Sequence, residues 1–340
     1  MPEPLNLAAL PVRRLNTGEA IPPLGLGTFG SDKYGPREIA DAVEGAIRYG
    51  YRLIDCAAVY QNEAEIGQAL RRVLDEGVVS RRELFITSKV WNDSHGPGQV
   101  LASCRKSLAD LQLDYLDLFF VHWPFPNYHP PGCSVDSRSP DAKPFSPAAY
   151  LEVWRQCEAL VDMGLVRHLG MSNMTIPKLE AVLPHCRIQP AALELECHPS
   201  FQQPELFDYA VAHHILPVGF CPIGSPSRPE RDRTAADVAD TELPEIREIA
   251  EAHGVHPAVI CLKWAVQRGV VPIPFSVKPP QYQSNLRCAA VDPLTDAEME
   301  RIRQADKNCR LVKGQVFLWP GASGWEDLWD EHGTATWAQP

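Results

Sequence analysis

Long hydrophobic runs and an excess of basic charge are both missing from this sequence. No window approaches the roughly 20 apolar residues that a transmembrane helix needs, and the first residues carry no cationic lead into an apolar segment. The formal net charge is −11 at pH 7, whereas a surface that binds nucleic acid or anionic lipid is basic. We therefore expect a cytoplasmic protein with neither a membrane nor a nucleic acid as partner.

Patterned metal ligands are missing as well. The ten cysteines include no C-x-x-C pair, and the eleven histidines include no H-E-x-x-H arrangement. Scattered cysteines inside apolar segments are typical of reduced, buried thiols, and a tetrahedral metal site needs ligands at defined spacings. We expect free thiols and no metal site.

The sequence does contain a regular alternation of short apolar runs and longer amphipathic stretches. Near-continuous apolar runs such as Leu118–Val121 predict strands that are buried on both faces, as in parallel sheets. Eight strand–helix units in 340 residues, of which 45% are hydrophobic, favour a closed (β/α)8 TIM barrel over an open sheet. The expected strands are 24–28, 52–55, 84–89, 116–122, 168–172, 191–196, 216–220 and 270–274. The helices that follow them are expected at 36–49, 62–75, 98–111, 147–163, 175–183, 203–213, 258–268 and 281–288.

Further segments decorate this barrel. A short hairpin that turns at Asn16–Gly18 should precede the first strand. We expect one domain over residues 1–340, with a barrel core at 12–308 and a C-terminal tail at 309–340. Two additional helices are expected at 243–253 and 295–307.

Two connections are too long to be simple turns, and the tail has an unusual composition. Residues 123–146 are rich in proline, and residues 222–241 are rich in Ser, Pro, Asp and Arg. Both follow strand ends, where long loops of compact domains are usually functional. The tail holds four of the eight tryptophans. We expect it to pack on the barrel exterior or rim, with contact to the substrate pocket as the alternative.

The segment Gly25–Gly30 satisfies the pattern G-x-G-x-x-G. This pattern indicates a dinucleotide-binding Rossmann turn when it follows a buried strand and opens a helix. Here Pro22 and Pro23 precede it, and proline does not donate to a central ladder. A first barrel strand loosened by glycine is the interpretation we favour, and the Rossmann turn is the alternative.

Titratable side chains stand at the ends of three consecutive strands. Asp55 ends one strand, Tyr60 follows it before the next helix, Lys89 ends the second and His122 ends the third. The carboxyl ends of parallel strands meet at one edge of a barrel, so these side chains should converge there. Taken singly, each has an ordinary structural explanation, such as a buried ion pair or a strand-end histidine. Together they favour a catalytic site.

These four groups suit the reduction of a carbonyl. A phenol has an ordinary pKa near 10, and we expect the ammonium of Lys89 to lower the pKa of Tyr60 while Asp55 keeps that ammonium charged. His122 would donate an N–H to the carbonyl oxygen. The set contains a proton donor and groups that can stabilise charge on the carbonyl oxygen, but it contains no nucleophile. Reduction therefore requires an external hydride donor.

At these residues the chain resembles the aldo-keto reductase family, and in particular its aldose and xylose reductase branch. The resemblance extends from about Val12 to Trp319. The segments that carry it are Leu15–Gly18, Ile21–Thr28, Ile54–Ala57, Tyr60–Glu63, Ser88–Trp91, Leu113–Leu118, His122–Pro124, Gly170–Asn173 and Glu196–Pro199.

The resemblance implies a role for each site residue. Tyr60 would be the proton donor, Lys89 and Asp55 would tune it, and His122 would orient the carbonyl. The substrate pocket would be lined by Phe29, Trp91, His122 and Trp123. The implied cofactor contacts are Thr28, Ser172, Asn173, Glu194, Phe220, Ser225, Glu230, Ser276, Val277, Lys278 and Asn285.

Two departures from the family pattern concern the nicotinamide end of the cofactor. Glu194 and Phe220 stand where the family usually has Gln and Tyr. A phenyl ring can still stack on nicotinamide. An ionised carboxylate at 194 would accept from the carboxamide but not donate, and it would favour the positively charged oxidised ring.

Two more departures concern the adenosine end. Phe275 and Gln281 stand where the family has a lysine and an arginine that grip the 2′-phosphate of NADP. Charge-assisted phosphate contacts are strong, so their loss should weaken NADP selectivity, although Lys278 can compensate in part. Glu230 would instead accept from the ribose diol of NAD. We expect NADP(H) or NAD(H) as cofactor, with dual or NAD-leaning use.

The sequence thus predicts a monomeric NAD(P)-dependent oxidoreductase that reduces sugar-like or small aliphatic and aromatic carbonyl compounds to alcohols. One alternative is an NAD-dependent polyol or aldose dehydrogenase that runs in the oxidative direction. Another is a cofactor-sensing or structural protein built on the same fold, against which the four retained side chains argue.

Overall fold

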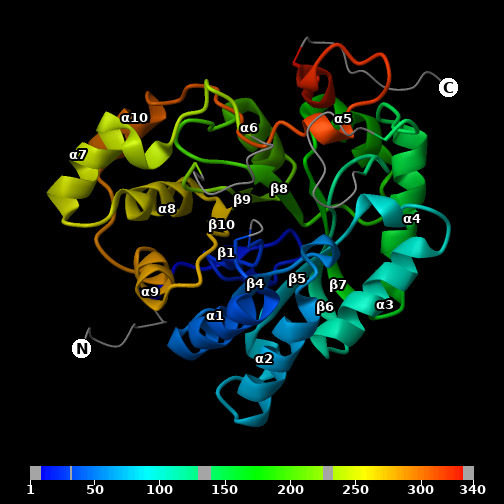
Figure 1. The fold of residues 1–340 in the computed structure, drawn as a ribbon, viewed down its shortest axis with the longest axis horizontal. Coiled ribbons are helices and arrows are strands. Elements are labelled where there is room, and N and C mark those ends of the chain that lie inside the picture. The colour runs from blue at the N-terminus through cyan, green and yellow to red at the C-terminus, as the bar shows by residue number, and fades with distance from the viewer. Residues whose placement is uncertain (1–8, 31–32, 129–138, 225–232, 332–340) are drawn as a thin grey trace.

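In the computed structural model, residues 9–30, 33–128, 139–224 and 233–331 are described. Eight parallel strands form one sheet in the order β10-β9-β8-β7-β6-β5-β4-β3, so each strand pairs with its neighbours in the sequence (Figure 1). The strands are β3 (Leu26–Gly27), β4 (Leu53–Asp55), β5 (Phe85–Val90), β6 (Leu116–Val121), β7 (Val166–Ser172), β8 (Ala192–Glu196), β9 (Leu216–Phe220) and β10 (Val271–Pro272). The expected (β/α)8 barrel is confirmed.

The sheet closes on itself between its first and last strands. Gly25 N donates to Pro272 O at 3.0 Å, Gly27 N donates to Pro274 O at 3.0 Å, and Gly27 bridges Phe275. A Cβ on Gly27 would lie 2.7 Å from Ile273 O, so a side chain there would push the closing strands apart. Gly25 and Gly27 of the G-x-G-x-x-G segment therefore serve barrel closure, and the Rossmann alternative is wrong.

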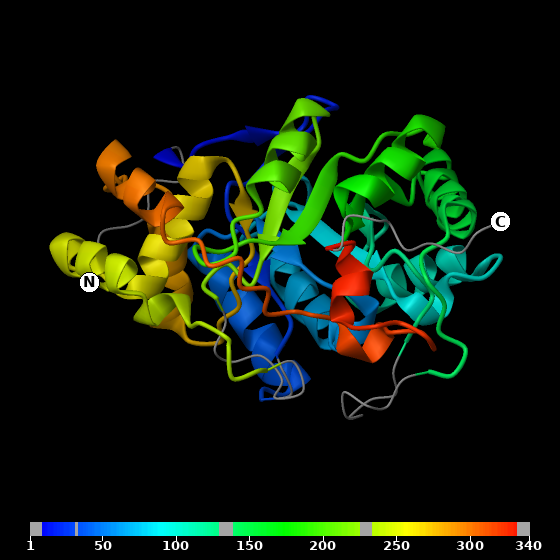
Figure 2. The same ribbon diagram turned by 90° about the horizontal axis from the view of Figure 1, so that it is seen from above.

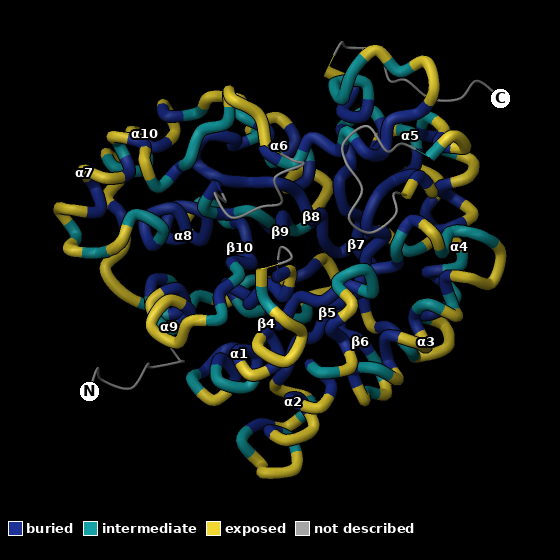
Figure 3. The backbone as a smooth tube through the Cα atoms, in the orientation of Figure 1, coloured by how far each residue is buried: buried dark blue, intermediate teal, exposed yellow. Residues whose placement is uncertain are grey.

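Helices cover the outer face of this barrel, and their exposed residues point away from it (Figures 1 and 3). In α1 the first residue is Pro36, whose fixed φ suits a helix start, and the helix ends at Gly50 with φ 138°. Its buried face presents Ile39 and Val43 to the strands, and each such side chain contributes roughly 1.5–3 kcal/mol when buried. The helices are α1 (Pro36–Tyr49), α2 (Glu63–Asp75), α3 (Gln99–Leu111), α4 (Pro147–Asp162), α5 (Ile176–Val182), α6 (Pro204–Ala212), α7 (Pro244–His253), α8 (Pro257–Arg268), α9 (Pro279–Arg287) and α10 (Asp296–Arg303).

The hairpin and the tail lie at opposite ends of the barrel (Figure 2). The hairpin pairs β1 (Arg13–Arg14) with β2 (Ala20–Ile21), as expected, and its Leu15 and Ile21 pack on the apolar side chains inside the barrel. The tail forms two short 3-10 helices, η8 (Gln315–Phe317) and η9 (Trp325–Trp329). Because the hairpin seals one end, the other end is left for a site.

Some observed boundaries differ from the expected ones. The last barrel helix begins at Pro279 rather than at 281, because two prolines can occupy its first turn. Helix α10 ends at Arg303 instead of 307.

In the described part of the chain, no helix is long and apolar enough to cross a membrane. No cluster of His, Cys, Asp or Glu among these residues could hold a metal, and nine cysteines are free thiols.

Candidate active site

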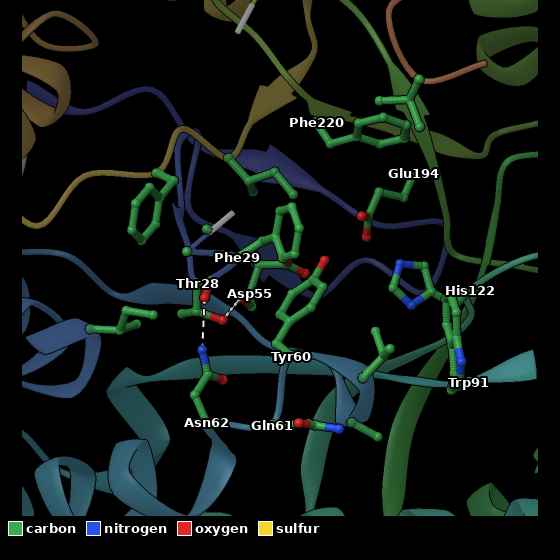
Figure 4. Close-up of a pocket in the computed structure, with 18 of the residues that line it drawn as sticks. Thr28, Phe29, Asp55, Tyr60, Gln61, Asn62, Trp91, His122, Glu194 and Phe220 are labelled. Carbon is green, nitrogen blue, oxygen red and sulfur yellow. Dashed lines mark hydrogen bonds between the residues drawn. The ribbon is translucent and has the colours of Figure 1, made fainter. Parts of the chain in front are cut away.

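The structure brings Asp55, Tyr60, Lys89 and His122 together at the open end of the barrel. Figure 4 shows Asp55, Tyr60 and His122 around one space. Asp55 is the last residue of β4, and it pairs in register with Thr87 of β5, so Lys89 extends beyond it along the neighbouring strand. His122 follows β6 directly, and Tyr60 ends the short 3-10 helix η2 (Ala58–Tyr60). Parallel pairing in one register therefore explains why residues far apart in the sequence meet here.

Lys89 is fully buried and bridges carboxylates from two strands. Its Nζ donates to Asp55 Oδ2 at 2.6 Å and to Cys56 O at 3.0 Å, and it lies 3.5 Å from Glu194 Oε1. Burial lowers the pKa of Lys89, but Asp55 and Glu194 outweigh that effect and raise it well above its usual value. Lys89 is therefore an ammonium throughout the neutral range.

Tyr60 lies above this ammonium. Lys89 Nζ is 5.3 Å from the centroid of the Tyr60 ring, and Phe29 packs on the other side with its centroid at 5.2 Å. Burial raises the pKa of Tyr60 well above its ordinary value, although Lys89 acts to lower it. The expectation that Lys89 brings this pKa below the usual range is wrong, because desolvation outweighs the effect of Lys89 and the nearby acidic groups act in the same direction as desolvation. Tyr60 keeps its proton at neutral pH and can serve as a donor.

His122 completes the set as a neutral imidazole. Its ring centroid is 5.9 Å from that of Tyr60 and 5.1 Å from the nearer Trp91 ring centroid. Burial, together with the positive charge of Lys89, lowers the pKa of His122 well below its usual value. The Nδ1 atom has no hydrogen-bond partner within the described residues, and Asn173 Nδ2 donates to the backbone carbonyl of His122 at 2.9 Å. The hydrogen bond from Asn173 anchors the backbone at His122, and the neutral ring can donate one N–H to a ligand.

Two residues of the same cavity wall carry a buried oxygen that has no partner in the described chain. Glu194 Oε2 and Asn173 Oδ1 are buried and unbonded, and both residues line the cavity. Burial and the nearby Asp55 raise the pKa of Glu194 to about 8, although Lys89 acts to lower it. Glu194 is therefore mainly a neutral acid at pH 7, and it can donate a hydrogen bond. The ionised form of Glu194, which would favour the oxidised ring, predominates only above about pH 8.

These groups, apart from the fully buried Lys89, line a cavity of about 1230 Å³. Cavities of roughly 300–1,000 Å³ hold drug-sized ligands, so this volume accommodates a larger molecule or two ligands together. The residues named from the sequence that line it are Thr28, Phe29, Trp91, Trp123, Asn173, Glu194, Phe220, Ser276, Val277 and Lys278, in addition to Asp55, Tyr60 and His122.

Four residues expected to contact a cofactor do not line the described wall. Ser172 is buried behind Asn173, which donates to its Oγ at 3.2 Å. Asn285 is a buried residue of α9 and lies outside the lining set. Ser225 and Glu230 lie outside the described residues.

Sequence reasoning missed much of the substrate side of the cavity. Val312, Gly314, Val316 and Phe317 of the tail line it, so the alternative expectation for this part of the tail is correct. Phe317 packs on Trp123 with a centroid distance of 4.5 Å. The only sign in the sequence that the tail reaches the cavity was its high tryptophan content, since nothing local in the sequence shows where a tail folds back.

A phenol, an ammonium, two carboxyl groups and a neutral imidazole at the mouth of a (β/α)8 barrel define a barrel oxidoreductase site. The profile of the Aldo/keto reductase family matches residues 23–307. The chain is 43% identical to aldo/keto reductase slr0942 of Synechocystis sp. over 93% of this chain and 95% of that protein. It is 40% identical to aldo-keto reductase family 1 member A1 of Bos taurus, over 88% and 90% of the two chains.

A solved structure agrees with the sequence relatives. An aldo-keto reductase of Bombyx mori, AKR2E4, determined in complex with NADP, superposes with a TM-score of 0.78 at 32% identity, covering 89% of this chain and 95% of that one. The chain belongs to the aldo/keto reductase family, and the resemblance stated from its motifs is confirmed.

Proposed function

We propose that this protein reduces aldehydes and ketones to alcohols with a reduced nicotinamide dinucleotide. The observation that carries this proposal is a phenol that keeps its proton, directly above the buried Lys89–Asp55 pair and beside a neutral His122. The bound cofactor supplies a hydride to the carbonyl carbon. Tyr60 gives its proton to the carbonyl oxygen, His122 donates an N–H to that oxygen, and Lys89 stabilises the phenolate that forms.

The cavity wall fits the nicotinamide end of such a cofactor. A carboxamide has one acceptor oxygen and an NH2 donor, and the wall offers the unpartnered Asn173 Oδ1 as acceptor and the neutral Glu194 as donor. Phe220 offers a ring on which nicotinamide can stack. The NADP bound in the Bombyx mori relative supports the same class of cofactor here.

The lining of the cavity favours apolar carbonyl substrates. Aromatic and aliphatic side chains surround the space next to Tyr60 and His122, and the tail contributes no charged side chain to the described wall. These aromatic and aliphatic residues are Phe29, Val59, Trp91, Trp123, Val312, Val316 and Phe317. We propose that small aromatic and aliphatic aldehydes are preferred over sugar-like ones, whose hydroxyl groups would lose hydrogen bonds on entry.

The direct test is an activity panel. The protein is incubated with NADH or NADPH and a set of aromatic, aliphatic and sugar aldehydes, and then with NAD and alcohols, while the absorbance of the reduced nicotinamide is followed. Turnover of aldehydes with KM values that rise from aromatic to sugar substrates supports the proposal. Turnover of polyols with NAD alone would support the oxidative alternative instead, and no turnover in either direction would contradict an enzyme.

We propose dual or NAD-leaning cofactor use, and a substitution tests it. The family resemblance implies that Phe275 lies near the adenosine end of the cofactor. Phe275 lines the cavity and packs on Tyr34 with a centroid distance of 5.6 Å, and Ser276 Oγ donates to the neutral Gln281 at 2.7 Å. We expect the KM values for NADPH and NADH to lie within about tenfold of each other, and Phe275→Lys to shift the ratio toward NADPH by about tenfold or more. Phe275→Met, which removes the ring without adding charge, is the control. A wild-type preference of a hundredfold for NADPH would refute this prediction.

The ionisation of Glu194 should control which redox form of the cofactor binds better. Its pKa of about 8 means that the group is neutral below that pH and ionised above it, and an ionised carboxylate attracts the positive oxidised ring. Between pH 6 and pH 9.5 we expect the affinity for oxidised relative to reduced cofactor to rise about tenfold, the equivalent of about one pKa unit. Titration of the tryptophan fluorescence at each pH measures it.

Two variants control this measurement. Glu194→Gln keeps a neutral side chain of the same shape, so its affinity ratio should stay flat with pH. Glu63→Gln alters another buried glutamate with a raised pKa, which bonds to Ser88 and Ser107 and does not belong to the described cavity wall. If the wild type shows no pH dependence, or if Glu63→Gln abolishes it, Glu194 is not the controlling group.

A further inference from the structure

A second buried charged cluster lies at the end of β8, apart from the catalytic residues. His198 Nε2 is 3.0 Å from Glu196 Oε1, and His198 Nδ1 is 2.9 Å from Asp240 Oδ2. Ser200 Oγ donates to the other oxygen of Asp240. All four side chains are at most 1% exposed. Buried charges are costly unless they are fully paired, so a cluster of this kind needs an explanation.

On one side this cluster holds the tail. Glu196 Oε1 accepts from the backbone N–H of Leu311 at 2.7 Å, and Oε2 accepts from that of Val312 at 2.9 Å. Hydrogen bonds from His198 lower the pKa of Glu196 in spite of its burial, so the group is ionised. Val312 is the first tail residue in the cavity wall. The bond from Glu196 therefore sets where the tail enters the substrate side of the cavity.

On the other side the cluster packs closely against the start of the loop that follows β9. Asp240 lies under the start of this loop, because a Cβ on Gly224, whose φ is +56°, would come within 2.5 Å of Asp240 Cγ. The residues just before Gly224, from Cys221 to Ile223, line the cavity next to Phe220. A second, less buried ion pair also joins the tail to the connection after β9: Lys313 Nζ lies 2.7 Å from Asp237 Oδ1.

His198 joins the two sides because it bonds to both carboxylates at once. Burial lowers its pKa, but Asp240 and Glu196 outweigh burial and raise it to about 9, so His198 is an imidazolium at neutral pH. Arg310 adds a second cation beside Glu196 and stacks on Trp329 of the tail at 3.6 Å. Loss of the imidazolium would leave the buried carboxylates of Glu196 and Asp240 each without one partner. We therefore expect the tail and the loop to lose their fixed positions together.

We propose that His198 is a positioning residue that fixes the tail at 311–317 against the loop at 221–224, and so sets the shape of the substrate end of the cavity. The proposal rests on the proposed carbonyl reduction, since it concerns the same cavity. His198 does not belong to the described cavity wall, so it acts through Glu196 and Asp240. Its loss should therefore affect how a bulky substrate binds more than how the bound substrate reacts.

The experiment compares His198→Gln with a matched control. His253 also bonds two carboxylates, with Nδ1 2.6 Å from Asp292 and Nε2 3.0 Å from Glu298, but it ends α7 away from the described cavity wall. For His198→Gln we expect the KM of an aromatic aldehyde to rise about tenfold, with kcat and the KM of a two-carbon aldehyde changed less than about threefold. His253→Gln should change none of these constants.

Hydrogen exchange of the cofactor-free protein gives a readout that does not depend on activity. His198→Gln should speed exchange in residues 309–317 and 220–224 together, and His253→Gln in neither. If His198→Gln does not fold, Lys313→Met tests the same connection at a less buried pair and should raise the same KM by a smaller factor. Equal KM values for the wild type and the variants, or faster exchange in one segment alone, would overturn the proposal. Loss of wild-type turnover with every aldehyde, with coupled exchange intact, would instead contradict only the proposed function.

Discussion

Tyr60→Phe should lower kcat for aldehyde reduction by about 10²–10⁴-fold while leaving cofactor affinity within about threefold of the wild type. Phenylalanine keeps the ring that packs on Phe29 and faces His122 but has no proton to give. In the folded protein burial raises the pKa of Tyr60, so the wild-type phenol holds its proton until the carbonyl oxygen becomes basic during hydride transfer. Single-turnover reduction of an aromatic aldehyde, together with fluorescence titration of the cofactor, measures both quantities.

A matched tyrosine elsewhere controls for the loss of a hydroxyl group. Tyr51 is fully buried, and its Oη donates to the carbonyl of Tyr282 at 2.7 Å, outside the described cavity wall. Tyr51→Phe should cost about 1 kcal/mol of stability and leave kcat unchanged. Should Tyr60→Phe retain more than a tenth of wild-type kcat, another group would have to supply the proton.

Lys89→Met should lower both stability and turnover. It removes the one charge that lies within 4 Å of both Asp55 and Glu194 in the described chain, and it leaves two buried carboxyl groups without their cation. Breaking a buried ion pair in this way costs about 3–5 kcal/mol, which corresponds to a fall of roughly 4–7 °C in Tm for a chain of this length. The phenolate left by proton transfer also loses its stabilising charge, so kcat should fall by about 10²-fold or more. Calorimetry and single-turnover kinetics on the folded fraction separate the two effects.

Lys263→Met is the control for Lys89→Met. Lys263 is a buried lysine of α8 whose Nζ donates to the carbonyls of Val291 and Asp292, and it too lies outside the described cavity wall. This variant should lose stability but keep its kcat. Equal kinetic losses in the two variants would show that the fall in turnover reflects general destabilisation rather than the site.

The barrel and the convergence of the proposed catalytic residues could be predicted because both depend on local pattern. Each apolar run carries its own strand signal, and each of Asp55, Lys89 and His122 stands at the end of one such run. Parallel pairing of successive strands then brings those ends to the same edge, whatever the loops do. The role of Gly25–Gly30 could not be decided from the sequence, because a glycine pattern does not show which strand will pack against it.

The charges in the site could not be assigned in the same way. The pKa of Tyr60 and that of Glu194 depend on burial and on carboxylates and an ammonium from β4, β5 and β8, whose distances exist only in the folded chain. Charge interactions decay with distance through space, and desolvation depends on every atom nearby, so neither follows from position in the sequence. This is why the expected direction for Tyr60 was wrong and the ionisation of Glu194 was left open.

Local residue order was therefore enough to predict the architecture, the family and the side chains that we propose to react, because periodicity and strand-end placement are short-range properties. Folding alone placed Phe317 against Trp123, tied Leu311 to Glu196 and gave Glu194 a pKa near neutrality. These contacts join segments more than a hundred residues apart, or sum the effects of several strands, and such long-range pairing leaves no periodic trace in the chain.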